Sequence, residues 1–456
     1  MKLPETNDTI VAQATPPGAG ALAVIRLSGP GAFGAAASFL SPAPAEPAHR
    51  SARMLAVKDG ARLVDRAVVV FYRGPASYTG QDTVEISCHG SPYIIRTIMN
   101  LALRGGARPA GPGEFTLRAF LNGKLDLTQA EAVGELIAAG SAGAHRAAIT
   151  QVEGAVSQRV RGIKASLVNL LAELEVRLDD SYEEIPALQI KDFALRAAAA
   201  LAETRELADG FEAGRGIKEG TRVVITGAPN SGKSSLLNAL LGYDRAMVSR
   251  EAGTTRDTLE AELELDGFSV IFTDTAGLNA RAASRLEREG MRRAAKAIER
   301  ADAVVLVSDG SVEETASDRK AEKEAARLAA GARLIRVINK ADLPLKRTPR
   351  GKDRLKISAK TGAGLPGLKA LLVAEQKKTF RDGAQAIVTS ARHFAALAAA
   401  GSELTALTAL FRKKNPPAEL AAEHLRGALN ELAAILGETA PEEVLADIFC
   451  KFCVGK

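Results

Sequence analysis

The sequence predicts a multidomain protein with an N-terminal α/β domain, a helical domain, and a second α/β domain inserted into the helical one. Three observations lead to this fold class. The 456 residues are enough for about three domains. Strand-like and helical runs alternate over residues 217–379, which is typical of a parallel sheet covered by helices. Ala- and Leu-rich helical segments lie on both sides of that stretch, so one discontinuous helical domain flanking an insertion is the simplest arrangement.

Residues 1–119 mix short strand-like runs with Gly and Pro turns. ALAVIRLSG (21–29) and RAVVVFYRG (66–74) are predicted strands, and SPYIIRTIMNLALRGG (91–106) is a predicted helix ended by glycine. PAGPGEFTLRAF (109–120) begins as a turn and becomes helical. These segments predict an α/β domain over residues 1–119.

Residues 120–216 are predicted to form the first part of the helical domain, and residues 380–456 the second part. Ala, Leu, Glu and Arg recur at helical spacing in both parts, as in LVNLLAELEVRL (167–178). Between them, LELDGFSVIFTD (263–274) carries Asp266-Gly267 at its middle, a hairpin signal that predicts an antiparallel edge strand. The other strand-like runs of the insertion are TRVVITG (221–227), ADAVVLVSDG (301–310), RLIRVINK (333–340) and LKISAK (355–360).

Composition limits the environment and the partners. Hydrophobic residues are 46% and charged residues 25%, and no apolar run approaches the roughly 18 residues of a membrane span. The N-terminus lacks the apolar core of a signal peptide, and three cysteines are too few for a disulfide framework. We therefore expect a cytoplasmic protein without a membrane partner. The net charge of +6 permits RNA as a partner without requiring it, and 4% aromatics argue against a broad platform for stacking bases.

GAPNSGKSS (227–235) fits the phosphate-loop pattern G-x-x-x-x-G-K-[ST] and lies between a strand-like and a helical run. The glycines let backbone N–H groups converge on phosphate oxygens at a helix N-terminus. Lys233 is expected to reach the β- and γ-phosphates, and the Ser234 hydroxyl to ligate Mg²⁺. The predicted nucleotide contacts of this loop are Asn230, Ser231, Gly232, Lys233, Ser234 and Ser235.

NKAD (339–342) follows a strand and indicates recognition of guanine. Asp342 can accept hydrogen bonds from the ring N–H and amino group of guanine, whereas adenine offers no matching pair of donors. Asn339 can contact the other polar edge of the purine, and the Lys340 stem can pack over the ring. SAK, with Ser358, Ala359 and Lys360, can place a backbone N–H near the guanine oxygen. An Asp after a strand is more often a turn residue, but together the motifs predict GTP.

Two further segments concern Mg²⁺ and hydrolysis. EAGTTRD (251–257) can present Thr255 to Mg²⁺, with Thr254 nearby, although a solvated polar loop explains it equally well. DTAGLNA (274–280) is predicted to meet Mg²⁺ and the end of the triphosphate through Asp274 and Gly277. The next residue, Leu278, cannot orient a water molecule, so hydrolysis requires another source of the chemistry usually credited to glutamine.

These motifs, with PGEFTLRAFLNGKLDLTQAEA (112–132) and the C-terminal FCVGK (452–456), resemble the MnmE (TrmE) family of tRNA modification GTPases over nearly the whole chain. The resemblance implies an N-terminal folate-binding and dimerisation domain at 1–119 and a Ras-like P-loop GTPase domain at 217–379. It also implies a homodimer that joins the FAD-dependent protein MnmG (GidA) in a heterotetramer. Together they would add an aminomethyl or carboxymethylaminomethyl group at C5 of the tRNA wobble uridine.

The same resemblance implies that K⁺ stabilises the charge that builds up on the nucleotide. Its ligands would be the Asn230 side chain and backbone carbonyls of Ser249, Glu251 and Thr254. Glu287 takes the position of the family's catalytic carboxylate and would act on the attacking water, with Glu289 close by in sequence. An exposed helix glutamate that pairs with Arg is the structural alternative for Glu287.

The resemblance further implies a site for a reduced folate, 5,10-methylene- or 5-formyl-tetrahydrofolate, formed by Arg26, Glu85, Lys124 and Lys456. A carboxylate suits the donor edge of a pterin and cations suit its glutamate tail, although each residue alone reads as a surface ion. PPGAGA (16–21) departs from the family pattern because Ala19 replaces an arginine.

Cys453 matches the family's terminal cysteine and is a candidate catalytic residue, with a buried small hydrophobe as the alternative. Cys450 is a local variation. The pair forms C-x-x-C without a second pair, so a closed zinc site is not expected.

Two other functions remain open from the sequence. One is a GTPase switch for ribosome assembly, but such switches lack the PGEFT region. The other is a folate-binding scaffold with an idle nucleotide domain, against which the intact Lys233, Ser234, Thr255 and Asp274 argue.

Overall fold

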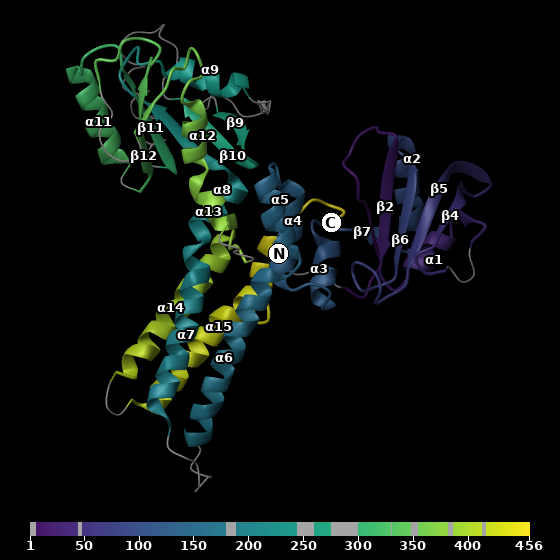
Figure 1. Ribbon diagram of the computed structural model, residues 1–456. Coiled ribbons are helices and arrows are strands. Elements are labelled where there is room, and N and C mark those ends of the chain that lie inside the picture. Colours follow the sequence, from purple (N-terminus) through teal and green to yellow (C-terminus); the bar gives the residue numbers. More distant parts are fainter. Residues whose placement is uncertain are drawn as a thin grey trace. The chain divides into compact units, whose positions relative to one another are not determined.

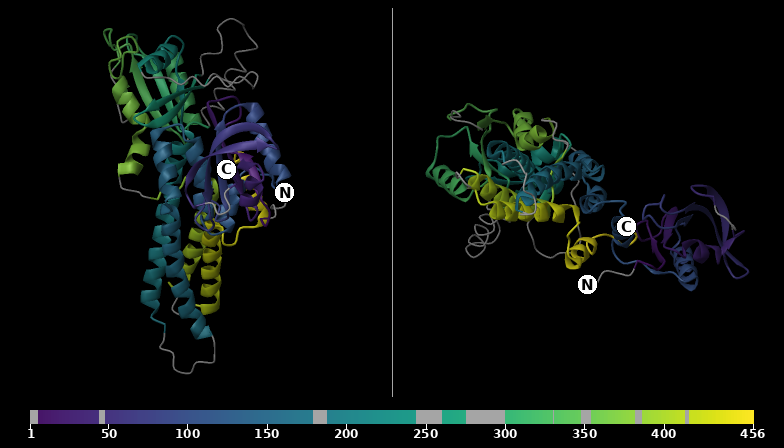
Figure 2. Two further views of the ribbon diagram at one scale, coloured as in Figure 1. Left: turned by 90° about the vertical axis from the view of Figure 1, so that its right-hand side faces the viewer. Right: turned by 90° about the horizontal axis from the view of Figure 1, so that it is seen from below.

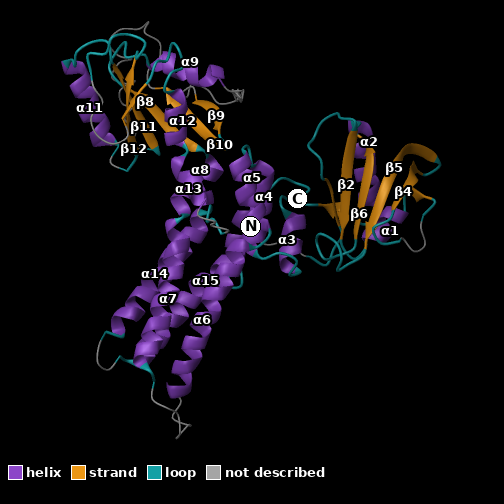
Figure 3. Cartoon of the chain, viewed as in Figure 1, coloured by secondary structure: helices purple, strands orange, loops and turns teal. Residues whose placement is uncertain are grey.

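The computed structural model describes residues 6–43, 48–178, 188–243, 260–274, 300–329, 331–347, 354–381, 386–412 and 416–456 (Figure 1). The chain divides into two compact units. The first comprises Met1–Gly134, Gln151–Leu201 and Ala399–Lys456, and the second comprises Glu135–Thr150 and Ala202–Ala398. Each unit contains one of the two β-sheets, whose strands are orange in Figure 3.

The first unit contains a seven-stranded sheet of order β3-β4-β5-β6-β2-β1-β7. The strands are β1 (Ile10–Gln13), β2 (Leu22–Ser28), β3 (Leu40–Ser41), β4 (Ala52–Asp59), β5 (Arg62–Tyr72), β6 (Thr83–His89) and β7 (Arg108–Pro109). Helices α1 (Ala32–Ala37) and α2 (Pro92–Arg104) share one hydrophobic core with residues such as Ile25 and Ile86. The predicted strands at 21–29 and 66–74 and the predicted helix at 91–106 are confirmed as β2, β5 and α2.

Alternating side chains of the long strands leave apolar residues uncovered by helices. Met54 and Val68 face each other across β4 and β5 and are 63% and 36% exposed, and Leu63 is 51% exposed. Their buried neighbours Leu55, Ala67 and Val69 belong to the core. A strand places successive side chains on opposite faces, so the β4–β5 part of the sheet has one face in the core and one face with exposed apolar residues.

Helices fill the rest of the first unit, in agreement with the predicted long helices. The further described helices that lie wholly or mostly in it are α3 (Glu114–Leu121), α4 (Leu127–Ala138), α6 (Ala155–Leu178), α7 (Ile190–Asp209), α14 (Ala391–Leu410), α15 (Ala418–Leu436) and α16 (Glu442–Phe449). Helices α6 and α15 pack side by side (Figures 1 and 2). Leu167, Leu170 and Leu174 of α6 are buried at helical spacing, which explains why this segment forms a helix. Leu117 of α3, Leu127 of α4 and Phe449 of α16 form a smaller core.

The second unit contains a six-stranded sheet of order β13-β12-β11-β8-β10-β9. The strands are β8 (Thr221–Thr226), β9 (Glu260–Leu265), β10 (Phe268–Asp274), β11 (Ala303–Asp309), β12 (Arg333–Asn339) and β13 (Arg354–Lys356). All neighbouring strands are parallel except β9 and β10, so the predicted antiparallel edge hairpin is confirmed. Asp266 and Gly267 both have positive φ, as a tight hairpin turn requires.

Helices contribute to apolar cores on this sheet. One core includes Leu236 of α9 (Lys233–Tyr243) and Leu368 of α12 (Leu365–Leu372), and another includes Ala325 of α11 (Ala316–Leu328). The other helices among the described residues are α5 (Ala142–Val152), α8 (Phe211–Glu219) and α13 (Ala374–Arg381). Within the described parts of the chain, no helix combines the length and apolar character that crossing a bilayer requires.

Candidate functional site

The phosphate loop joins the end of β8 to the start of α9 and is closely surrounded by backbone. Gly227 has φ +145°, and a Cβ there would lie 2.1 Å from the Val307 carbonyl oxygen. Gly232 has φ +94°, and its Cβ would lie 2.2 Å from Asn339 Nδ2. Both positions therefore require glycine. Asn230 also has positive φ, a conformation that Asn tolerates better than most residues.

Lys233, Ser234 and Ser235 form the first turn of α9, where free backbone N–H groups and the helix dipole favour an anion. The Lys233 ammonium donates to the carbonyl oxygens of Gly227 at 3.1 Å and Ala228 at 2.9 Å. It therefore lies back over the loop that would surround a phosphate. The Ser231 hydroxyl is buried and has no hydrogen-bond partner among the described residues.

Asn339 connects the phosphate loop to the predicted guanine-binding residues. It is 2% exposed at the end of β12, and its Nδ2 donates to the Ser231 carbonyl oxygen at 3.1 Å. Its Oδ1 accepts a 3.0 Å hydrogen bond from the Ala359 N–H. The Ala359 N–H thus joins two loops of the protein in this structure, and the predicted contact of the SAK backbone with the guanine oxygen stays a prediction.

Asp342 and Lys340 are held by their neighbours. Ser358 Oγ donates to Asp342 Oδ1 at 2.6 Å, and this hydrogen bond lowers the pKa of the Asp342 carboxyl. Lys340 has φ +63°, and its ammonium donates to Asp309 Oδ2 at 2.5 Å. Burial alone would raise the pKa of Asp309, but the hydrogen bonds from Lys340 and Ser311 lower it. Asp342 thus presents a carboxylate that suits the donor edge of guanine.

The structure therefore brings most of the predicted nucleotide residues to the carboxyl ends of the parallel strands of the second sheet. Lys360, which is exposed, lies in the same loop as Ser358 and Ala359. Asp274 ends β10 opposite Ile225 of β8, so its backbone lies beside the strand that leads into the phosphate loop. Ser249, Glu251, Thr254, Thr255, Gly277 and Glu287 lie outside the described residues. Of the predicted metal ligands, the described part of the chain positions Ser234 and Asn230.

The predicted folate residues lie in the first unit. Arg26 of β2 and Glu85 of β6 are direct partners in the antiparallel ladder. Arg26 Nη2 lies 2.7 Å from Glu85 Oε1, and Arg26 Nε donates to the same oxygen at 2.9 Å. The sequence alone does not predict this ion pair, which the register of the two strands creates. Tyr72 donates to Glu85 at 3.5 Å, and burial together with this carboxylate raises the pKa of Tyr72.

Aromatic rings surround the guanidinium of Arg26. Its Cζ lies 5.6 Å from the ring centroids of both Tyr78 and Phe115, within the range of cation–π attraction. The Tyr78 hydroxyl lies 2.9 Å from Thr116 Oγ1. Tyr72, Tyr78, Phe115 and Thr116 are not among the residues predicted for this site from the sequence. The available signal was the PGEFT motif itself, which contains Phe115 and Thr116.

Lys124 and the C-terminal segment complete this region. Lys124 Nζ donates to the Pro75 carbonyl oxygen at 3.1 Å. The Phe115 N–H donates to the Lys456 carbonyl oxygen at 3.2 Å, and the Gly113 N–H donates to that of Cys453 at 3.3 Å. Pro112 and Val454 form an antiparallel bridge. The tail 453–456 is therefore joined to the start of α3.

The three cysteines differ in environment. Cys450 and Cys453 are exposed, so the alternative that Cys453 is a buried small hydrophobe is wrong. Cys88 is buried, and burial together with nearby Asp65 raises its thiol pKa to about 11. A thiol with such a pKa carries little thiolate at neutral pH. The solvent-accessible thiols are thus the two near the C-terminus.

A cavity in the second unit lies away from these groups. Its lining includes Thr221, Ala303 and Arg333, the first residues of β8, β11 and β12. The phosphate loop follows the last residue of β8. The cavity therefore lies at the opposite end of the strands, where β8, β11 and β12 begin. It contains none of the residues that the sequence analysis predicted for nucleotide binding.

Comparisons with known proteins agree with this geometry. A model described as MnmE helical domain matches residues 127–453, and one described as GTP-binding protein TrmE N-terminus matches residues 9–124. The tRNA modification GTPase MnmE of Syntrophotalea carbinolica is 39% identical, with 99% of each chain covered. That of Thermus thermophilus is 40% identical, also with 99% of each chain covered. That of Akkermansia muciniphila is 38% identical and covers 98% of this chain and 99% of its own.

Proposed function

The chain belongs to the MnmE family of tRNA modification GTPases, and from this premise we propose that it is a K⁺-dependent GTP hydrolase that modifies C5 of the tRNA wobble uridine. It acts with the FAD-dependent partner MnmG and takes one carbon from a reduced folate. The product carries an aminomethyl or carboxymethylaminomethyl group. GTP hydrolysis drives conformational change and does not supply the transferred carbon.

The observation that carries the nucleotide part is the double contact of Asn339. One side chain bonds both the phosphate loop, through Ser231, and the 358–360 loop, through Ala359. The residues for the phosphates and those for the base are therefore parts of one site. Asp342, held by Ser358, supplies the acceptor that distinguishes guanine from adenine.

Two residues of the phosphate loop and the helix that follows it, Asn230 and Ser234, indicate where the metal ions would bind. A serine hydroxyl at the first turn of the helix after a phosphate loop suits Mg²⁺, so Ser234 is the proposed ligand. Leu278 has no polar group for the attacking water, and Asn230 has an amide oxygen that suits a monovalent cation. We assign K⁺ to Asn230, Ser249, Glu251 and Thr254, and Mg²⁺ to Ser234 and Thr255, with Asp274 nearby.

The folate part rests on the group around Arg26. The Arg26–Glu85 pair offers donors and acceptors beside the rings of Tyr78 and Phe115, which suits a flat heterocycle with polar edges. Lys124 and the tail with Cys453 and Lys456 belong to the same unit. The proposed homodimer would use the exposed apolar face at Met54, Leu63 and Val68, since apolar surface of this kind marks interaction sites.

Glu287→Ala is expected to bind GTP with nearly wild-type affinity and to lose about 10²–10⁴ in turnover, because a group that acts on the attacking water contributes that much. Phosphate release and equilibrium nucleotide binding measure the two quantities. Glu289→Ala is the matched control, two residues away, and should keep its turnover. Normal turnover in Glu287→Ala with loss in Glu289→Ala would move the catalytic role to Glu289.

Mass spectrometry of wobble uridines tests the pathway directly. Cells that lack this protein should contain tRNA without the aminomethyl-type groups at C5. The wild-type gene should restore these groups. The Lys233→Ala gene should not, because the ammonium group that is expected to bind the β- and γ-phosphates is lost. Unchanged wobble uridines in the deleted cells would reject the proposed function and favour a role such as ribosome assembly.

A further inference from the structure

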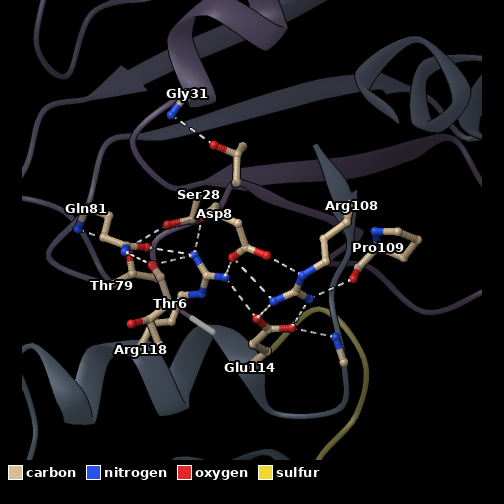
Figure 4. Close-up of polar contacts among 12 residues, drawn as sticks. Thr6, Asp8, Ser28, Gly31, Thr79, Gln81, Arg108, Pro109, Glu114 and Arg118 are labelled. Atoms are coloured by element: carbon tan, nitrogen blue, oxygen red, sulfur yellow. Dashed lines mark hydrogen bonds and ion pairs between the residues drawn. The ribbon is translucent and has the colours of Figure 1, made fainter. Parts of the chain in front are cut away.

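Four charged side chains form one network at the start of α3 (Figure 4). Arg108 comes from β7, Glu114 and Arg118 come from α3, and Asp8 precedes β1. Glu114 accepts from Arg108 Nη2 at 2.6 Å and from Arg118 Nη2 at 2.9 Å. Asp8 accepts from both arginines as well. Two carboxylates and two guanidinium groups therefore balance each other.

The inner half of this network is fully removed from water. The Arg118 side chain is 0% exposed and that of Glu114 is 2%, whereas Arg108 and Asp8 are 37% and 36% exposed. Arg118 Nη1 also donates to the Asp8 carbonyl oxygen at 2.6 Å and to Gln81 Oε1 at 3.1 Å. Burial alone would raise the pKa of Glu114, but the hydrogen bonds from Arg108 and the Gly111 N–H lower it. A buried ionic network is weak evidence for stability, but it can fix one arrangement of the chain.

The arrangement that Glu114 fixes is the turn before α3. Its Oε2 accepts from the Gly111 N–H at 2.8 Å, which closes residues 111–114 into a turn. Gly113 has φ +63°, and a Cβ there would lie 2.7 Å from the Phe449 carbonyl oxygen. The turn thus fits closely against the end of α16 and against Phe452, so a change in its path would displace the start of the tail.

The tail is held by the two residues on either side of Glu114. The N–H groups of Gly113 and Phe115 donate to the carbonyl oxygens of Cys453 and Lys456. At the other side of the tail, a Cβ on Gly455 would lie 2.3 Å from the Gln13 carbonyl oxygen at the end of β1. The tail therefore passes between the PGEFT turn and the N-terminal sheet.

The residues that follow Glu114 contact the candidate folate group. The Phe115 ring lies beneath Arg26, and Thr116 bonds Tyr78. Phe115 is consequently shared: its backbone N–H holds Lys456 while its ring packs on Arg26. A single turn, set by one buried carboxylate, connects the tail to the Arg26–Glu85 pair.

We propose that Glu114 is a positioning residue for the folate reaction, because it fixes the 111–114 turn. The N–H groups of Gly113 and Phe115 at this turn hold Cys453 and Lys456, and the Phe115 ring packs on Arg26. This inference rests on the proposed function for its chemical consequence. The position of the tail can be measured without folate, so an experiment can reject the positioning role of Glu114 and the proposed folate function independently.

The experiment uses the full-length protein with Glu114→Gln, which keeps the shape of the side chain and removes its charge. Hydrogen exchange should rise about tenfold or more in peptides that contain residues 112–116 and 452–456, because the turn and tail open locally. Affinity for 5-formyl-tetrahydrofolate should fall about tenfold. GTP turnover, which depends on the second unit, should stay within about twofold of wild type.

Asp59→Asn is the matched control, since it removes a carboxylate from the exposed Asp59–Arg104 pair of the same unit. It should change neither the hydrogen exchange of the tail nor the affinity for 5-formyl-tetrahydrofolate. If Glu114→Gln does not fold, Arg108→Gln tests the same link from the partly exposed side. Unchanged tail exchange in a folded variant would overturn the inference. If hydrogen exchange of the tail rises in Glu114→Gln but the wild-type protein does not bind folate, the positioning role of Glu114 is supported and the folate function is rejected.

Discussion

Asp342→Asn is expected to weaken GTP binding by about 10²–10³-fold and to improve binding of xanthosine triphosphate. Guanine presents two donors, the ring N–H and the amino group, and the carboxylate accepts from both. Hydrogen bonds to a charged group contribute about 1.5–3 kcal/mol each, and 1.4 kcal/mol is tenfold in affinity. Xanthine has an oxygen in place of the amino group, so the donor and acceptor of an asparagine amide match it. Equilibrium binding of the two nucleotides measures the change.

Ser358→Ala is the control for this substitution. The Ser358 hydroxyl holds the Asp342 carboxylate at 2.6 Å, and the predicted contact of the SAK segment with guanine is a backbone N–H. Loss of the hydroxyl should therefore weaken binding much less and leave guanine preferred. A guanine preference that survives Asp342→Asn would show that another residue reads the base.

GTP turnover is expected to be about 10²–10⁴ times faster in K⁺ than in Na⁺ at equal ionic strength. A cation between the β- and γ-phosphates can supply the stabilisation that an arginine finger provides, which is about 10³–10⁵. The smaller Na⁺ holds its water more tightly and is less well matched to a ring of carbonyl oxygens. The family resemblance assigns this stabilisation to a cation and not to an arginine, so the salt dependence should be large.

Asn230→Ala should remove most of the difference between the two salts, because it deletes the one side chain among the proposed K⁺ ligands. The positive φ at Asn230 disfavours alanine, so Asn230→Gly, which has no such penalty, separates loss of the ligand from backbone strain. Equal wild-type rates in K⁺ and Na⁺ would refute the cation hypothesis.

The sequence predicts features that are set by neighbouring residues. The phosphate loop follows a strand and opens a helix, and the Asp266-Gly267 hairpin needs two positive φ angles that Asp and Gly accept. It does not predict contacts set by register or by distant segments. Arg26 and Glu85 meet because β2 and β6 pair in one register, and the Gly113 N–H meets Cys453 from the far end of the chain. The Glu114 network was missed for the same reason: its members come from three separate segments.

Because Cys88 is buried and the two cysteines near the C-terminus are exposed, a fluorescent dye can be attached selectively near the C-terminus. With the Cys88 thiol buried and its pKa raised to about 11, a maleimide dye at neutral pH would react at Cys450 and Cys453. Replacing Cys450 by serine leaves Cys453, whose carbonyl oxygen accepts from the Gly113 N–H, as the single attachment point. Changes in emission from that dye would follow release and recapture of the tail in real time, in a chain otherwise unaltered.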